Sequence, residues 1–473
     1  MRRFKLGVGG LVLSLGAGCA ANKPAANDTT IAASEQTDTE PATPGETGSP
    51  GETGSPDETG SPDETGEAPY TGPLNVLVVL VDTLRADHIQ SMGYPVENTP
   101  NLLAWSEDAV IFERMISQDK NTTPSLSSIF TGLWPSTHGC CGQGQGQPDH
   151  AFETMAEIFQ ASGYLTATLY KAAALDDWGD FWEGFDERHL VPGDNVDGHS
   201  AEELTDYTVA WLEAASERDE PFFAFVHYLD PHLPYRAPDE YYERFVPADN
   251  TSTLDGTPEQ MNELFATPGY TITDDDIERM LALYDGEIAY WDEHFGRVLD
   301  ALEGLAIDDR TVVAILADHG DQFYEHANWS HLQYHQEVIH VPLLLRVPGV
   351  EGRRVTDRVQ TIDLPPTLAD LTGVTPAASW PGRSLAGAMV GEALAPTDIL
   401  VGDADAHAFI NKDGLKYILH QPTPNGVRLY DLEVDPLEEN DLVQNVELLD
   451  QMRAEAAAAI AAAEALRAEL LDE

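Results

Sequence analysis

The chain has few basic residues. Its 25 Lys and Arg residues stand against 82 Asp and Glu residues, which gives a formal net charge of -57. This balance excludes nucleic acid as a partner, because binding a phosphate backbone requires positive charge. The simplest consequence of the acidity is solubility. With 473 residues the chain has room for one large α/β domain, or for a large domain and a small one.

The chain also has few cysteines, three in all: Cys19, Cys140 and Cys141. Adjacent cysteines can close only a strained ring, so the pair at 140 and 141 is excluded as a staple across the fold. The run GQGQGQ that follows the pair is typical of a loop. We interpret the two thiols as having no special role, with a strained, redox-labile pair as the alternative.

The N-terminus lacks an apolar run long enough to cross a membrane. Arg2, Arg3 and Lys5 precede the short apolar stretch Leu6–Leu15, and Gly16-Ala17-Gly18 lead to Cys19. This order is typical of an export signal over residues 1–18. It resembles a bacterial lipoprotein signal, although Gly16 stands where a leucine-like residue is usual. We predict a lipid on Cys19 and a location in the bacterial cell envelope; the alternative is an ordinary cleaved signal with an incidental cysteine.

Residues 19–72 contain hardly any bulky apolar side chain. They include a six-residue repeat, GETGSP, GETGSP, DETGSP, DETG. Such a segment cannot bury enough apolar surface to offset its chain entropy. We predict a disordered acidic tether that holds the globular part away from a membrane.

The rest of the sequence contains apolar runs that end on charged or imidazole groups. Asn75–Val81 ends on Asp82, and three further runs behave alike: Tyr164–Tyr170 before Lys171, Phe222–Tyr228 before Asp230-Pro231-His232, and Thr311–Ala317 before Asp318-His319. Uninterrupted runs of this length indicate strands buried on both faces, as in a parallel sheet. Ligands bind at the carboxyl ends of such strands. The pattern therefore predicts an α/β fold with a polar site at one sheet edge, and it favours a metal site.

A candidate nucleophile follows in the segment Asn121-Thr122-Thr123-Pro124. Thr123 before Pro124 has the form of a helix N-cap with proline at the first helical position. Thr122 would then precede a helix N-terminus, where an anion is favoured. A hydroxyl there, beside a metal, is placed to attack phosphorus or sulfur. A plain helix-capping role for Thr122 explains the local sequence equally well.

An ordered series of motifs from about residue 75 to 442 resembles the sulfatase family of the alkaline phosphatase superfamily. The motifs are VLVDTLRADH, TPNL, TTPSLSSIFTGLWPSTHG, FVHYLDPHLPY, AILADHGDQFYEH, VPLLLRVPG, DLPPTLADLTGV, PGRSL and LYDLEVDPLEENDL. The resemblance implies an alkaline phosphatase-like fold: a large, mostly parallel central sheet flanked by helices, over residues 73–380. For residues 381–473 we expect a small antiparallel-sheet subdomain and an Ala-rich helix.

The resemblance also implies roles for individual residues. Asp82, Thr122, Asp318 and His319 would hold a divalent metal cation, for which calcium, zinc and manganese all suit the ligands. Thr122 stands at the nucleophile position, and Lys171, His232 and His331 stand where the family holds ester oxygens or protonates the leaving group. The simpler alternatives are helix caps for Asp82 and Asp318 and a surface position for His331.

Three departures from the family pattern bear on the reaction. Thr122 cannot become the aldehyde hydrate that sulfatases make from cysteine or serine, Leu126 replaces the usual arginine, and Thr83 replaces a second aspartate. We therefore expect an exported hydrolase of sulfate or phosphate esters, acting on a small-molecule, glycan or lipid ester through Thr122. A phosphoethanolamine-type phosphotransferase and a catalytically silent, ligand-binding relative remain as alternatives.

Overall fold

The computed structural model describes residues 72–140, 151–171, 179–191, 200–257, 271–420 and 426–472, with positions 70, 175, 259 and 260. By its internal contacts the chain divides into Met1–Ala68 and Pro69–Glu473, and the second unit is described below. The predicted export signal, Cys19 and nearly all of the tether lie outside the described residues, as does Cys141. Cys140 is buried.

A central eight-stranded sheet organises this unit, in the order β10-β2-β9-β6-β1-β5-β3-β4. Its strands are β1 (Asn75–Val81), β2 (Val110–Ile116), β3 (Leu165–Tyr170), β4 (Glu187–Leu190), β5 (Phe222–Tyr228), β6 (Thr311–Leu316), β9 (His340–Arg346) and β10 (Arg353–Gln360). Only β9 runs antiparallel to its neighbours, β6 and β2. Every residue of β1, β3, β5 and β6 is buried, as their uninterrupted apolar runs predict.

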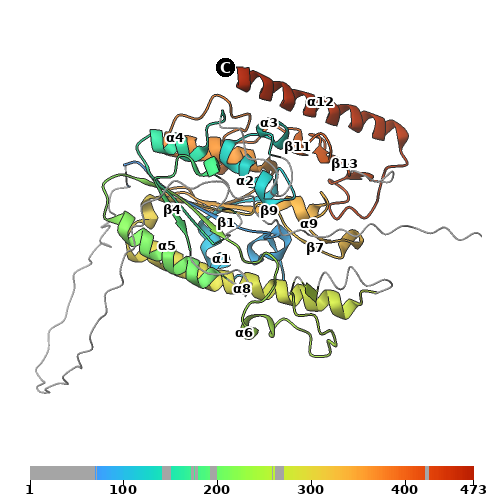
Figure 1. Ribbon diagram of the computed structural model, residues 1–473, viewed down its shortest axis with the longest axis horizontal. Helices are drawn as coiled ribbons and strands as arrows, with labels where there is room; N and C mark the ends of the chain where they lie inside the picture. Colours follow the sequence, from blue (N-terminus) through green and yellow to red (C-terminus); the bar gives the residue numbers. More distant parts are fainter. Residues whose placement is uncertain are drawn as a thin grey trace, which may run out of the picture. The chain divides into compact units, whose positions relative to one another are not determined.

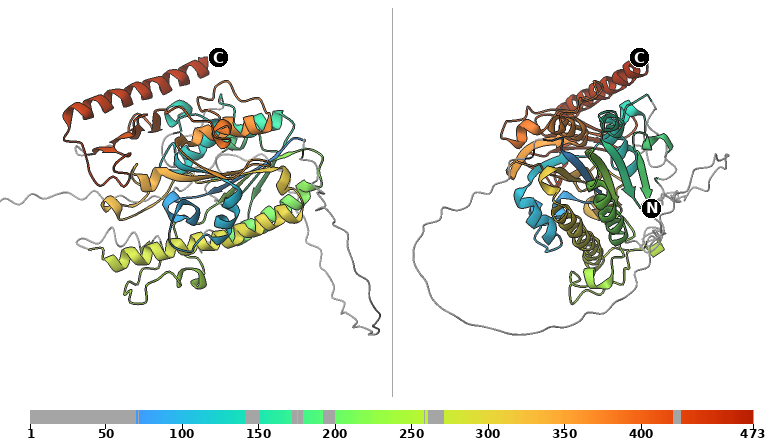
Figure 2. Two further views of the ribbon diagram at one scale, coloured as in Figure 1. Left: turned by 180° about the vertical axis from the view of Figure 1, so that it is seen from behind. Right: turned by 90° about the vertical axis from the view of Figure 1, so that its left-hand side faces the viewer.

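Helices cover both faces of this sheet (Figures 1 and 2). One face carries α1 (Pro100–Trp105), α5 (Ala201–Ser216) and α8 (Asp274–Gly304), with α6 (Asp239–Tyr242) packed on α8. The other carries α2 (Thr122–Thr131), α3 (Pro135–His138), α4 (Met155–Ala161) and α10 (Leu364–Thr372). The 31-residue helix α8 starts where Thr273 and Asp276 form a reciprocal capping box. The remaining short elements are the hairpin β7 (Gln322–Phe323) and β8 (Trp329–Ser330), and the helices α9 (Gln336–Ile339) and α11 (Ala386–Met389).

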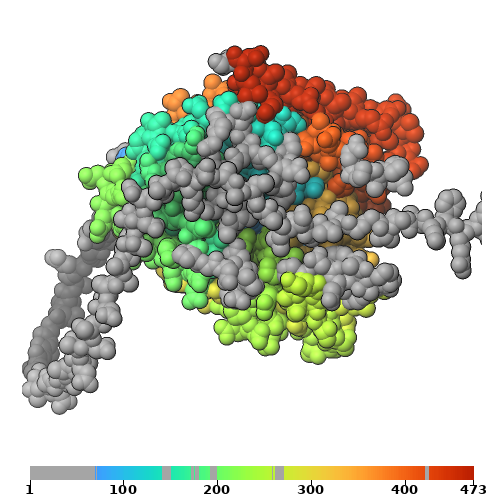
Figure 3. All heavy atoms as spheres, in the orientation of Figure 1, coloured from blue at the N-terminus to red at the C-terminus, as the bar shows by residue number. Residues whose placement is uncertain are grey.

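A four-stranded antiparallel sheet follows near the C-terminus. It contains β11 (Ile399–Gly402), β12 (His407–Ile410), β13 (Leu415–Leu419) and β14 (Val427–Asp431), in that order. One face packs on Val338 and Ile339 of α9. The other packs under the helix α12 (Val446–Asp472), which lies along the molecular surface in Figure 3. The predicted fold class, a large, mostly parallel sheet between helices plus a small antiparallel sheet, is confirmed.

The described part of the chain includes no helix with both the length and the apolar character of a membrane span.

Candidate active site

The register of the central sheet brings two carboxylates to one place. Leu80 of β1 lies opposite Leu316 of β6 in a parallel pairing. Asp82 and Asp318 each follow these residues by two positions, so the two side chains emerge level at the carboxyl edge of the sheet. Both are almost fully buried, at 2% and 0% exposure. Two buried carboxylates this close together are stable when a positive charge compensates them or when one of them binds a proton.

Each of the two carboxylates has one oxygen bound and one oxygen without a hydrogen-bond partner. Asp318 Oδ1 accepts from the backbone N–H groups of Thr83 (3.2 Å) and His319 (2.9 Å). Asp82 Oδ2 lies 3.0 Å from Nε2 of His227. The other oxygens, Asp82 Oδ1 and Asp318 Oδ2, are buried and have no hydrogen-bond partner among the described residues, although Nε2 of His319 lies 3.4 Å from Asp318 Oδ2. Orphaned buried oxygens of this kind fit a cation that would complete their coordination.

His319 supplies a nitrogen beside these oxygens. Ligand atoms of Asp82, Asp318 and His319 all lie within 4.8 Å of one another. Burial, followed by repulsion from His331, lowers the pKa of His319 to about 3, so its ring is neutral and able to ligate at neutral pH. Burial and the negative charge of Asp82 raise the pKa of Asp318 well above its ordinary value. A divalent cation would reverse that effect, because it neutralises both carboxylates at once.

Thr122 lies next to this cluster. Its Oγ1 is 3.3 Å from Nε2 of His319, and the residue is 5% exposed. The helix α2 begins at Thr122 itself, with Asn121 as N-cap, so the prediction that Thr123 is the N-cap is wrong. The side chain of Asn121 instead donates to Asp119 Oδ1 at 2.9 Å, which orders the turn before the helix. Thr122 is therefore in the first turn of α2 rather than before it.

Two serines connect this helix to the segment that contains Asp318. Ser117 Oγ, just after β2, donates to the backbone oxygen of Asp318 and lies 3.1 Å from Ser125 Oγ of α2. Ser125 Oγ also donates to the backbone oxygen of Asp119 at 2.9 Å. Leu126, at the position of the family's arginine, is fully buried in the apolar core. These contacts fix the first turn of α2 relative to Asp318, and with it the position of the Thr122 hydroxyl.

Two of the predicted histidines lie at the same rim of the sheet. The His331 ring centroid is 4.4 Å from that of His319 and 5.8 Å from that of His232. His331 Nδ1 lies 2.8 Å from Asp321 Oδ1, and Tyr235 donates its hydroxyl to Asp321 Oδ2 at 2.5 Å. The structure thus gathers Asp82, Thr122, His232, Asp318, His319 and His331.

Lys171 is in a different arrangement. It is 4% exposed at the end of β3, and its ammonium forms an ion pair with Glu203 of α5. Its ion-pair partner among the described residues is thus Glu203, which is not one of the histidines or carboxylates above. Its role at an ester oxygen stays a prediction.

Sequence reasoning missed two residues of the site, His227 and Asp321. His227 is the histidine in the otherwise largely apolar strand FFAFVHY. Asp321 is the last residue of the motif Asp318-His319-Gly320-Asp321. A titratable group in the middle of an otherwise apolar buried strand is the signal that could have identified His227.

A second group of possible metal ligands, His326, His335 and Glu438, lies beside the small sheet. Lys416 Nζ of β13 already lies 2.6 Å from Glu438 Oε1, and His326 Nε2 lies 3.3 Å from Glu337 Oε1. The two imidazole rings are stacked 3.9 Å apart and nearly parallel, at 8°, so their in-plane lone pairs do not converge on one point. The ammonium supplies the cation here, and we assign this group to an ion-pair network.

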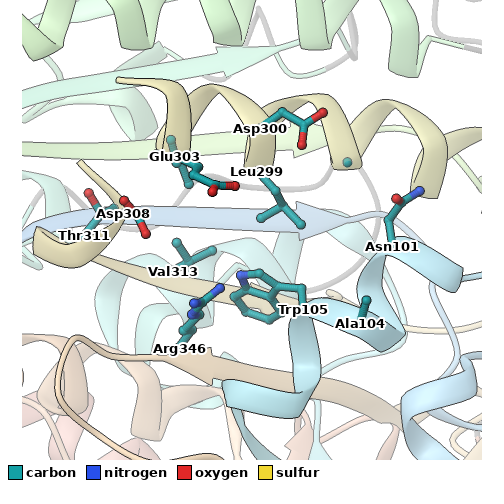
Figure 4. A pocket seen from close by; sticks show the side chains of 12 residues that line it. Asn101, Ala104, Trp105, Leu299, Asp300, Glu303, Asp308, Thr311, Val313 and Arg346 are labelled. Carbon is teal, nitrogen blue, oxygen red and sulfur yellow. The ribbon is translucent and has the colours of Figure 1, made fainter. Parts of the chain in front are cut away.

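A cavity of about 390 Å³ lies elsewhere in the same unit (Figure 4). Thr311, the first residue of β6, lines it together with Trp105 of α1 and Asp300 and Glu303 of α8. It is therefore next to the amino end of β6, whereas Asp318 follows the carboxyl end. The cavity is separate from the candidate active site.

Comparison with known proteins agrees with this geometry. The family profile "Sulfatase" matches residues 74–374. Iduronate 2-sulfatase of Homo sapiens is 25% identical over 385 residues, covering 64% of this chain and 70% of that protein. Choline-sulfatase of Rhizobium meliloti is 24% identical over 431 residues, covering 79% and 83%. The crystal structure of a phosphonate monoester hydrolase of Agrobacterium radiobacter shares the fold, with a TM-score of 0.68, 21% identity and coverage of 84% and 96%.

The sulfatase profile matches more than half of the length of the chain. The chain therefore belongs to the sulfatase family and is a sulfuric/phosphoric ester hydrolase.

Proposed function

We propose that the enzyme is a metal-dependent hydrolase that uses the Thr122 hydroxyl as its nucleophile and prefers phosphate esters to sulfate esters. The observation that carries the proposal is the position of Thr122 Oγ1, which lies 3.3 Å from His319 Nε2. His319 in turn offers a ligand atom within 4.8 Å of those of Asp82 and Asp318. Asp82, Asp318, His319 and Thr122 would hold the cation. When bound, a divalent cation lowers the pKa of an adjacent hydroxyl and neutralises the ester oxygens.

The residues of the chain then divide the reaction into two steps. Thr122 Oγ, having released its proton to solvent, forms a bond to phosphorus while the ester bond breaks on the opposite side. The departing oxygen takes a proton from His331 or His232, which lie at the same rim. Water then cleaves the phospho-threonine and frees Thr122.

The methyl group of threonine is the reason for the preferred substrate. An aldehyde hydrate has a second hydroxyl that can expel sulfate from the covalent intermediate, and Thr122 has none. Phosphorus accepts attack by water on the intermediate, so a threonine enzyme can still turn over phosphate esters. Calcium, zinc and manganese all fit a site of two carboxylates, one imidazole and one hydroxyl. The substrate is proposed as a small-molecule, glycan or lipid ester.

The test is a pair of substitutions at Thr122 with a control at the next residue. Thr122→Ala should reduce turnover of an aryl phosphate by several orders of magnitude, and Thr122→Ser should retain part of it. The control Thr123→Ala removes the neighbouring hydroxyl of the same helical turn and should leave turnover near normal. A phosphate on the Thr122 peptide after acid quenching, seen by mass spectrometry, would support the covalent step directly. Near-normal rates for Thr122→Ala would refute it.

Assays of the unsubstituted enzyme with different esters and acceptors separate the alternative functions. A phosphotransferase would release little inorganic phosphate with or without an alcohol acceptor. When an acceptor is supplied, the phosphoryl group would be transferred to it, and a new phosphate ester would form along with the alcohol of the original ester. A silent relative would show no turnover of aryl sulfates, phosphomonoesters or phosphodiesters while still binding metal.

We further propose that the protein is exported and anchored in the bacterial cell envelope through a lipid on Cys19. The support is the order of basic, apolar and small residues that ends on this cysteine. The protein should partition into detergent, and Cys19→Ala should release it to the aqueous phase. Aqueous partitioning of the exported, unsubstituted protein would overturn the anchor.

A further inference from the structure

The strand β5 carries a histidine whose contacts lie within the central sheet. His227 is 1% exposed and lies opposite Leu80 of β1 in the parallel pairing. Its Nε2 is 3.0 Å from Oδ2 of Asp82, which is itself 2% exposed. Its other nitrogen, Nδ1, is buried and has no hydrogen-bond partner among the described residues.

The contact between His227 and Asp82 is a hydrogen bond donated by the ring. A carboxylate oxygen only accepts, so Nε2 is the nitrogen that directs its hydrogen at Asp82 Oδ2. The bond involves Oδ2 alone, so it leaves Asp82 Oδ1 available to a cation.

Asp82 and Asp318 are held in different ways. Backbone N–H groups of Thr83 and His319 fix Oδ1 of Asp318, and these cannot be removed by a side-chain change. Among the described residues, His227 is the one group that donates a hydrogen bond to the carboxylate of Asp82. The backbone N–H of Asp82 is already used, because it donates to the backbone oxygen of Tyr228 at 2.9 Å. Rotation of the Asp82 carboxylate is thus restrained by a single side chain.

We infer that His227 is a positioning residue for the metal site: it fixes Asp82 Oδ2 so that Oδ1 faces the cation, and thereby sets the affinity for the metal. The inference rests on the metal dependence in the proposed function. Substitution of a residue that holds a metal ligand in this way commonly weakens metal binding by roughly 10- to 100-fold. His227 itself does not ligate the metal or touch the substrate in this assignment.

The test compares glutamine and asparagine at position 227. The amide nitrogen of glutamine can occupy the place of Nε2 and reach Asp82, whereas that of asparagine is level with Nδ1 and falls short. Titration calorimetry of the full chain, freed of metal by chelation, would measure binding of Ca²⁺, Zn²⁺ and Mn²⁺. His227→Ala and His227→Asn should weaken the best-bound ion about 10- to 100-fold, and His227→Gln should stay within a few-fold of the parent.

A control and three adverse outcomes complete the design. The control is His407→Gln, at another buried histidine, in β12 of the small sheet, whose ring contacts the backbone oxygen of Asp403. This variant should leave the dissociation constant for the metal unchanged. Equal metal affinities for the Gln and Asn variants would overturn the inference, even if the Ala variant fails to fold. Tight binding by the parent and by all His227 variants would overturn it while leaving the proposed function intact. No binding by the parent would overturn both.

Discussion

Lys416 Nζ lies 2.6 Å from Glu438 Oε1, and both side chains are fully buried. The pair joins β13 of the small sheet to the segment after β14, and Glu438 Oε2 also accepts from the backbone N–H of Gln336 at 2.8 Å. Gln336 begins α9, five residues after His331. A buried ion pair thus links the small sheet to the segment that carries one of the site histidines.

Removing one partner of this pair should be costly. Lys416→Met leaves the Glu438 carboxylate buried without its cation, and we expect a loss of about 3–5 kcal/mol in the free energy of unfolding. The double variant Lys416→Met, Glu438→Gln should recover much of that loss, because no isolated charge then remains. Urea unfolding of the three proteins at pH 7 measures both effects. A double variant no more stable than the single one would show that the pair does not act through its charges.

The stability of the fold should decline in mild acid because of buried neutral histidines. Burial, and next the charge of Arg467, lower the pKa of His138 from 6.5 to about 3. The unfolded chain takes up a proton at this position below pH 6.5, and the folded chain does so only near pH 3. The free energy of unfolding should therefore fall by about 1.4 kcal/mol per pH unit between pH 6 and 4 from this group alone.

His138→Asn tests this contribution. Its side-chain oxygen can still accept from the backbone N–H of Cys140, as Nδ1 of His138 does at 3.1 Å. Urea unfolding in chelator at pH 4.5, 5.5 and 7 should show a pH dependence shallower by about one proton. Parallel curves for the parent and His138→Asn would contradict the assignment.

Asp318→Asn should separate stability from metal binding. Burial and the charge of Asp82 disfavour the ionised form of Asp318, so a neutral amide should stabilise the metal-free protein by about 1–2 kcal/mol. The amide oxygen can keep the hydrogen bonds from Thr83 and His319. In the presence of a chelator, the variant should have a higher melting temperature than the parent. Added Ca²⁺, Zn²⁺ or Mn²⁺ should raise the melting temperature of the parent only. A metal-induced rise in the variant would place the cation elsewhere.

The sequence allowed the sheet and part of the site to be predicted for a clear physical reason. Strands buried on both faces have almost no polar interruption, and Asp82 and Asp318 mark where two of them end. The strand order β6-β1-β5 was not readable, so nothing indicated that His227 would face Asp82. The start of α2 was misplaced because Asn121, Thr122 and Thr123 are all competent caps. The pairing of Lys171 with Glu203 depends on how α5 packs, which local sequence does not encode.

The last prediction concerns which histidine protonates the leaving group. His331 Nδ1 contacts Asp321, which leaves Nε2 as the nitrogen that can deliver a proton to an ester oxygen. Burial alone would raise the pKa of Asp321, but the hydrogen bond and charge of His331 lower it, as expected for a carboxylate that supports an imidazolium. His232 Nδ1 instead lies 2.6 Å from the backbone oxygen of Leu233, a neutral partner. We therefore assign the general acid to His331.

Substrates with different leaving groups test this assignment. An alkoxide is a poor leaving group and needs a proton, whereas a nitrophenolate departs without one. His331→Gln should therefore slow the cleavage of alkyl phosphates by about 10²- to 10⁴-fold. The same variant should slow the cleavage of nitrophenyl phosphate far less. Asp321→Asn should show the same selectivity to a smaller degree, and His189→Gln should show none. If His232→Gln is the variant with the steep dependence on leaving group, the acid is His232. An equal loss with both substrates in His331→Gln would instead indicate that His331 binds the ester and transfers no proton to it.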